Sequence, residues 1–177
     1  TAEGERYWRL NQFLLPFYSM IPPHPKDANL VRMWVPMTDE RCSVMAVSFR
    51  PDRALGEAEL TAWRNGKTTH RLLIPVTTTP VQRLDNDYLI DRQVQKTQTY
   101  TGIEGIRAQD AMVTESPGPI VDRSREYLGT SDRAIIAMRR TLIEAAEALR
   151  DEGRVPEGVL QPHLYRVRAT QAVLPDM

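Results

Sequence analysis

The first part of the chain alternates apolar and polar residues, as β-strands do. Extended segments are predicted at residues 7–20, 30–37 and 42–49, and the polar sequence Thr38-Asp39-Glu40-Arg41 joins the last two as a hairpin. Along residues 42–49 both sets of alternate positions are largely apolar, which indicates a strand covered on both faces. The pattern therefore predicts that the chain begins with antiparallel strands.

The alternation fades between residues 50 and 85, where the sequence is mostly polar and is interrupted by glycine and proline. We interpret this stretch as a long surface insertion with one short apolar strand at about residues 72–76. Loops of this length are usually functional lids or interface elements.

Helical patterns follow the insertion. A short helix is predicted to start at Asp85-Asn86-Asp87, and another covers residues 107–115 and ends before Pro117. The longest helix is predicted at residues 130–152, capped by Thr130 or Ser131 and ended by Gly153 in a left-handed conformation. Its apolar stripe, which is expected to pack on the sheet, consists of Ile135, Met138, Leu142, Ala146 and Leu149. The order of these elements gives an α+β architecture.

Composition narrows the function classes. The chain has 177 residues, enough for one domain with a substantial core, and carries 23 basic and 23 acidic residues. This balance gives no electrostatic case for a nucleic-acid partner or an anionic membrane surface. The apolar runs are too short for a membrane-spanning helix, and the first residues lack the apolar segment of a signal peptide. We therefore expect a soluble, cytoplasmic protein.

The candidate chemistry centres on Asp110, which stands among small and apolar sequence neighbours in residues 105–116. A carboxylate that leaves water needs a cation or several hydrogen-bond donors. Metal ligation would meet that need. A structural role, as a helix cap or in an ion pair with Arg107, would meet it equally well, and the residues alone leave both readings open.

A catalytic non-haem iron site needs two histidines beside one carboxylate. The three histidines, His24, His70 and His163, lie at no helical spacing from one another, so each is interpreted as a surface or turn residue. The one cysteine, Cys42, excludes an internal disulfide and is interpreted as a small buried hydrophobic residue.

Two other sites are not supported. Ser116 does not lie in a nucleophile-elbow sequence. Asp85, Asp87 and Asp91 lack the later glutamate that a calcium loop requires.

A series of motifs follows in a fixed order along the chain, at residues 16–17, 21–23, 34–37, 86–92, 95–96, 100–103, 108–110, 115–116, 118–124, 126, 128–132 and 139–140. These motifs resemble those of Rieske-type non-haem iron ring-hydroxylating oxygenases, in the branch of phthalate and phenoxybenzoate dioxygenases and related demethylases. The resemblance covers most of the chain apart from the insertion and about the last twenty residues. Pro117 departs from the family pattern, because relatives often carry methionine there.

The resemblance implies a helix-grip (START/Bet v1-like) domain, a curved antiparallel sheet around a long C-terminal helix, of which residues 1–177 are the incomplete C-terminal part. Asp110 falls where the family supplies the carboxylate of its 2-His-1-carboxylate iron site. The two histidine ligands and the Rieske [2Fe–2S] domain would precede this chain.

For the intact enzyme the resemblance implies Fe(II), O₂ and electrons from NAD(P)H, delivered by a reductase or a ferredoxin through the Rieske cluster. Such an enzyme hydroxylates an aromatic substrate, as a mono- or dioxygenase, or demethylates it oxidatively. It is a homotrimer in which the cluster of one subunit serves the iron of the next. With one of three ligands, this chain alone is expected to bind iron weakly and to be inactive.

Substrate contacts are expected from the strands. Arg9 and Arg32 would pair a substrate carboxylate through bidentate bonds. Apolar residues would line a cavity that leads to Asp110, with ordinary core packing as the alternative; these are Phe13, Phe17, Val35, Met45 and Val47.

Two other functions remain open on the sequence. The first is a helix-grip module that binds an apolar ligand without a metal. The second is an assembly domain whose insertion, residues 52–85, makes subunit contacts.

Overall fold

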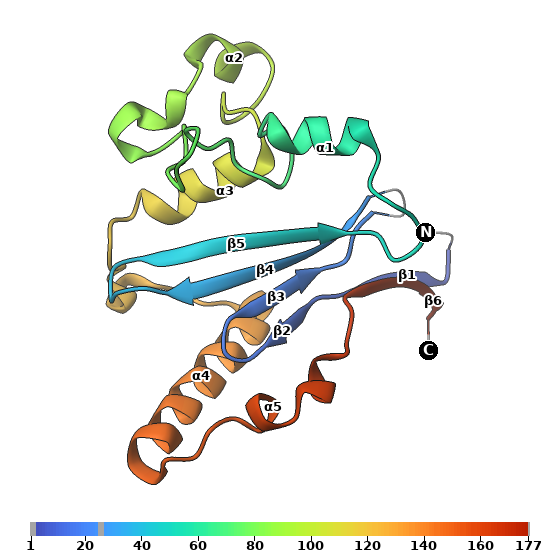
Figure 1. Cartoon of the computed structure of the whole chain (residues 1–177), viewed down its shortest axis with the longest axis vertical. Helices are drawn as coiled ribbons and strands as arrows, with labels where there is room; N and C mark the ends of the chain where they lie inside the picture. Colours follow the sequence, from blue (N-terminus) through green and yellow to red (C-terminus); the bar gives the residue numbers. More distant parts are fainter. Residues whose placement is uncertain (1–2, 25–26, 177) are drawn as a thin grey trace. The chain divides into compact units, whose positions relative to one another are not determined.

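The structure is a computed structural model that describes residues 3–24 and 27–176 (Figure 1). The chain divides into two compact units. One consists of Thr1–Arg50 with Asp122–Met177, and the other of Pro51–Val121. No helix among the described residues combines the length and apolarity that crossing a bilayer requires.

The first unit contains a four-stranded antiparallel sheet in the order β2-β3-β4-β5. The strands are β2 (Gln12–Leu14), β3 (Tyr18–Ile21), β4 (Asn29–Pro36) and β5 (Cys42–Phe49). The predicted hairpin between the last two is confirmed, because the backbone N–H groups of Met37 and Thr38 both donate to the Arg41 carbonyl group. The strands predicted at residues 30–37 and 42–49 are therefore confirmed within a residue, whereas the segment predicted at 7–20 is divided into three separate strands.

The predicted covering of β5 is wrong for the described residues. Val44, Met45 and Val47 are all exposed, and so is Cys42, which had been interpreted as buried. The exposed residues lie on both faces of β5, so neither face of this edge strand is fully covered, and Cys42 is its first residue, at the hairpin end.

A separate two-stranded sheet pairs β1 (Glu5–Leu10) with β6 (Thr170–Pro175) in antiparallel register (Figure 1). Strand β6 was not predicted. Its six residues have no strong alternation, and they form a strand because β1, more than 160 residues earlier in the sequence, supplies the hydrogen-bonding partner.

The long helix α4 (Arg133–Glu152) is confirmed, as is its end at Gly153, which has φ 66° and ψ 15°. Its start differs from the prediction. Thr130–Asp132 form the 3₁₀ turn η3, and Asp132 accepts a hydrogen bond of 2.8 Å from the Gly129 N–H instead of leaving the cap to Thr130 or Ser131.

The residues of α4 that are covered in the structure differ from the predicted apolar stripe. Ala148 is buried and Met138, Leu142 and Ala145 are half-buried, whereas Ile135, Ala146 and Leu149 are exposed. The helix is thus covered along a narrower line than the sequence pattern indicated.

The chain after α4 packs back on the four-stranded sheet through α5 (Glu157–Leu160) and the 3₁₀ helix η4 (Pro162–Tyr165). The Tyr165 hydroxyl group donates to the Leu15 carbonyl group, and its ring meets the Tyr18 ring edge-on with centroids 6.1 Å apart. A further 3₁₀ turn, η2, covers Arg123–Arg125.

The second unit is mainly helical, with α1 (Glu57–Arg64), the 3₁₀ segment η1 (Leu84–Leu89), α2 (Arg92–Thr97) and α3 (Ile106–Glu115). Helix α1 lies inside the predicted insertion and was missed. Its N-cap is Gly56, which has no side chain to signal a helix start, and the Glu59 carboxylate accepts the Gly56 N–H at 2.8 Å.

The strand expected near residues 72–76 is reduced to a single bridge between Leu73 and Pro80. The insertion is therefore part of a compact unit that continues to Val121. Taken together, antiparallel sheets and a long helix confirm the α+β class and are consistent with a helix-grip domain.

Candidate functional site

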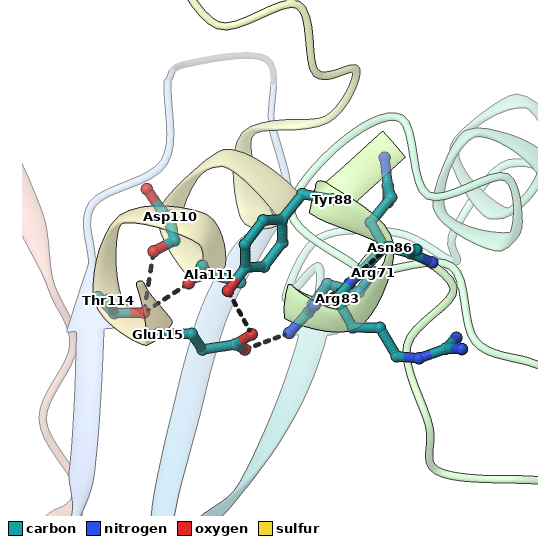
Figure 2. A network of polar contacts seen from close by, with 9 residues as sticks. Arg71, Arg83, Asn86, Tyr88, Asp110, Ala111, Thr114 and Glu115 are labelled. Carbon is teal, nitrogen blue, oxygen red and sulfur yellow. Dashed lines mark hydrogen bonds and ion pairs between the residues drawn. The ribbon is translucent and has the colours of Figure 1, made fainter. Parts of the chain in front are cut away.

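Asp110 is the fifth residue of α3 and is half-buried (Figure 2). The N-cap of this helix is Gly105, so Asp110 does not cap it. Of the two structural roles that the sequence left open for Asp110, helix capping is therefore excluded.

The apolar sequence neighbours of Asp110 point elsewhere. Ala108 and Ala111, each 1% exposed, face the core of the unit, where Ala108 packs with Tyr88 and Ile103. At 100° per residue, Asp110 lies about 160° around the helix from Ala108 and about 100° from Ala111. The carboxylate is therefore turned to a different side of the helix from these two alanines, about 60° from the buried Arg107, and Asp110 itself is half-buried.

The N-terminal end of α3 is fixed by a close backbone contact. Gly105 has φ 89°, and a Cβ atom placed on it would lie 2.3 Å from the Gly66 carbonyl oxygen. The Gln109 side chain then donates to the Ile103 carbonyl group at 3.0 Å. Only glycine meets both the positive φ and the contact at this position.

The C-terminal end of α3 is held by the carboxylate of Glu115 (Figure 2). Its Oε1 lies 2.9 Å from Arg71 Nη1, and its Oε2 accepts a hydrogen bond of 3.2 Å from the Tyr88 hydroxyl group. Arg71 also donates through Nη2 to the Gln82 carbonyl group. We call Arg71, Tyr88 and Glu115 the Glu115 cluster.

Tyr88 is 2% exposed, and burial raises the pKa of its phenol group, with the Glu115 carboxylate acting in the same direction. The phenol therefore stays protonated and donates. The short helix predicted to start at Asp85 is present as the 3₁₀ segment η1, but it is kinked: Asp87, Tyr88 and Leu89 have φ values of 51°, 53° and 53°, which are strained for residues other than glycine. Asn86 braces this turn by accepting from the Arg83 N–H at 3.0 Å and donating to the Val81 carbonyl group at 2.7 Å (Figure 2).

The described residues do not by themselves fit an iron site, because they contain no group of three or more His, Cys, Asp or Glu side chains able to hold a metal ion. His70 stacks near Trp63, with ring centroids 5.2 Å apart. His24 and His163 belong to the other unit.

The residues predicted to line a substrate cavity are divided between the two faces of the sheet. The register places Val35, Met45 and Val47 on one face, and Phe13 and Arg32 on the other. Phe17 lies in the turn between β2 and β3, with its ring 4.8 Å from that of Tyr18. Arg9 donates to the Pro22 carbonyl group at 3.2 Å.

An apolar pocket of about 520 Å³ lies in the first unit, between the β2–β4 face and the C-terminal segment. Its lining includes Leu14, Tyr18, Met20, Val31, Pro162 and Tyr165. None of the cavity residues expected from the sequence lines it. The strand residues do follow one face of the sheet, but the covering segment, η4, carried no recognisable sequence signal.

Sequence comparison adds the decisive observation. A family model described as "LigXa C-terminal domain like" matches residues 1–177. The chain belongs to the LigXa C-terminal domain family.

Two proteins of known function are similar to this chain over most of its length. The 3-chlorobenzoate-3,4-dioxygenase oxygenase subunit of Comamonas testosteroni is 34% identical over 179 residues, covering 93% of this chain and 41% of that protein. The phthalate 4,5-dioxygenase oxygenase subunit of Pseudomonas putida is 30% identical over 151 residues, which cover 84% of this chain and 33% of that protein. The chain thus spans less than half the length of either relative. The predicted relationship to oxygenase subunits of the phthalate dioxygenase type is confirmed.

Proposed function

We propose that this chain forms part of the catalytic domain of a Rieske-type oxygenase, which uses Fe(II) and O₂ to hydroxylate or oxidatively demethylate an aromatic substrate. The observation that carries the proposal is the family match over residues 1–177, together with two relatives that are oxygenase subunits of dioxygenases. Residues 1–177 are the C-terminal part of that domain. As a single chain they are inactive.

Asp110 is the iron ligand that this chain contributes. Two features support the assignment: residues 108–110 resemble the family motif that carries the carboxylate ligand, and helical geometry turns the Asp110 side chain away from Ala108 and the core cluster. Two histidine ligands and the Rieske [2Fe–2S] domain come from outside this chain. Bound Fe(II) would supply the activation of O₂, and the contribution of this chain is to hold one carboxylate in place.

An aromatic carboxylate is the proposed substrate class, because the named substrates of both relatives, 3-chlorobenzoate and phthalate, carry carboxylate groups. Arg32, 8% exposed on β4, and Arg9 on β1 are the cations proposed to pair with it. Electrons come from NAD(P)H through a reductase or a ferredoxin, and the intact enzyme is a cytoplasmic homotrimer.

The test is an Asp110→Asn substitution in the full-length protein, with Asp52→Asn, an exposed acid of the same unit, as the matched control. Iron per subunit after gel filtration is expected to fall at least tenfold in Asp110→Asn and to stay unchanged in the control. Stoichiometric iron in Asp110→Asn would overturn the assignment. Stoichiometric iron in residues 1–177 alone would contradict the external histidine ligands.

The 520 Å³ apolar pocket favours a second candidate, a helix-grip module that binds an apolar ligand without a metal. Binding of a fluorescent aromatic probe to iron-free protein distinguishes the two. A binding module would lose the probe in Val31→Trp, which fills the pocket, and keep it in Asp110→Asn. Absence of probe binding in the unsubstituted protein would eliminate this candidate.

A further inference from the structure

We propose that Arg71, Tyr88 and Glu115 are positioning residues that set the orientation of the Asp110 carboxylate by fixing helix α3. This inference rests on the proposed role of Asp110 as an iron ligand. It concerns residues 71, 88 and 115, to which the sequence assigned no role and which reach Asp110 only through the helix.

The carboxylate of Glu115 contacts a residue outside its own helix, and its location in the helix explains why. Glu115 is the last residue of α3, where the helix dipole disfavours a negative charge. Arg71 offsets this charge at 2.9 Å; its side chain is 12% exposed and that of Glu115 is 43% exposed, so solvent reaches the pair from the side of Glu115. The helix end is therefore tied to a cation from another segment, 44 residues earlier.

The second donor to Glu115 comes from strained backbone. Tyr88 lies in the middle of three consecutive non-glycine residues with positive φ, a conformation that costs about 1–3 kcal/mol per residue. Such strain persists only where the surroundings determine the conformation, and here it delivers a buried phenol group to Glu115 at 3.2 Å. Oε1 and Oε2 of Glu115 are thus held by donors from two separate segments.

Packing holds α3 through the part of the helix before its last turn. Arg107, Ala108 and Ala111 are buried there and Met112 packs against the core, whereas residues 113–115 at the end of the helix are exposed. A carboxylate about 5–6 Å from the helix axis moves by roughly 1.5 Å when the helix rotates by about 15°. Functional groups must be held within about 0.5 Å, so the Glu115 cluster, which holds the exposed end of the helix, limits the movement of the Asp110 carboxylate.

The chain offers a matched control at Glu59. Its carboxylate accepts from Arg53 at 2.9 Å and from the Gly56 N–H at 2.8 Å, so it too joins one arginine and a second donor within the same unit. Glu59 lies in α1, a different helix from the one that carries Asp110.

The experiment compares Glu115→Gln with Glu59→Gln in the full-length holoenzyme. It measures the affinity for Fe(II) by competition with a chelator and the EPR spectrum of the mononuclear iron after addition of nitric oxide. Glu115→Gln is expected to lower iron affinity 10- to 100-fold and to change the spectrum, whereas Glu59→Gln leaves both unchanged. Arg71→Lys, which keeps the charge, is expected to retain more affinity than Arg71→Met.

Equal losses in Glu115→Gln and Glu59→Gln would show a merely structural role and overturn the inference. If Glu115→Gln does not fold, Tyr88→Phe takes its place, because it keeps the ring and removes one donor to Glu115. A smaller loss of iron affinity is expected for it. If its iron affinity and EPR spectrum are unchanged, the inference is overturned. If Asp110→Asn keeps its iron, the proposed function itself fails. If Asp110→Asn loses iron while Glu115→Gln behaves as the unsubstituted protein, only the present inference fails.

Discussion

Arg139 binds both carboxylate oxygens of Glu126, with Nη1–Oε2 at 2.5 Å and Nη2–Oε1 at 3.0 Å. This bidentate pair ties α4 to the segment that precedes it, and Arg123 adds a third contact to Oε1 at 2.9 Å. The hydrogen bonds from Arg139 lower the pKa of the Glu126 carboxyl group, with further lowering from the charges of Arg139 and Arg123.

This pair predicts a pH dependence of stability. The folded-state pKa of Glu126 is depressed, so its contribution is present above the unfolded-state pKa of about 4.3 and is lost as pH falls through the folded-state value. The melting temperature of Glu126→Gln should therefore lie below that of the unsubstituted protein at pH 7. The two should converge as pH falls below about 4, and a constant difference across that range would contradict the prediction.

Tyr88→Phe tests the hydrogen bond to Glu115 with the core packing left intact. Removing the hydroxyl group should lower the free energy of unfolding by about 1–2 kcal/mol, because the acceptor is a charged group. Tyr88→Ala should cost about 3–5 kcal/mol, because it also leaves a cavity beside Ile103 and Ala108. Urea unfolding measures both, and equal losses would show that the hydroxyl group carries the whole contribution.

Gly105→Ala should be among the more damaging small substitutions in this chain. It places a Cβ atom 2.3 Å from the Gly66 carbonyl oxygen, in addition to the positive-φ strain. Gly118 also has positive φ but has open space around it, so Gly118→Ala isolates the strain, at about 1–2 kcal/mol. A loss larger by about 1–3 kcal/mol is expected for Gly105→Ala, and equal melting temperatures would refute the close contact.

Asp91 acts as a helix cap. Its Oδ1 accepts from the N–H groups of Gln93 and Val94, both at 2.9 Å, at the start of α2. Asp91→Ala should destabilise the protein by about 1 kcal/mol, whereas Asp91→Asn, which keeps the acceptor, should cost much less. Chemical denaturation of the two variants checks this, and the reverse order would assign the effect to charge instead of capping.

The sequence predicts best those elements whose signals are local. Helix α4 and strands β4 and β5 were found because their periodicity extends over eight or more residues and Gly153 marks a helix end. Strand β6 and helix α1 were missed, since one depends on pairing with β1 and the other is capped by a glycine without a side chain.

For a similar reason the sequence could single out Asp110 as a candidate but could not predict its surroundings. Helical geometry turns Ala108 and Ala111 to sides of the helix other than that of Asp110. The Glu115 cluster joins residues 27 and 44 positions apart, and no local pattern reveals such contacts. The cavity prediction mixed Phe13 with Val35 because the pairing register, which decides the face of each residue, is set by the turn at residues 15–17.

The orientation of Asp110 separates what this residue does from what holds its unit together. A substitution that removes only the carboxylate takes nothing from the Ala108–Tyr88–Ile103 core or from the Glu115 cluster. Such a variant keeps both of these sets of contacts. Its iron content and its melting temperature, measured side by side, therefore separate the loss of a ligand from the loss of the fold.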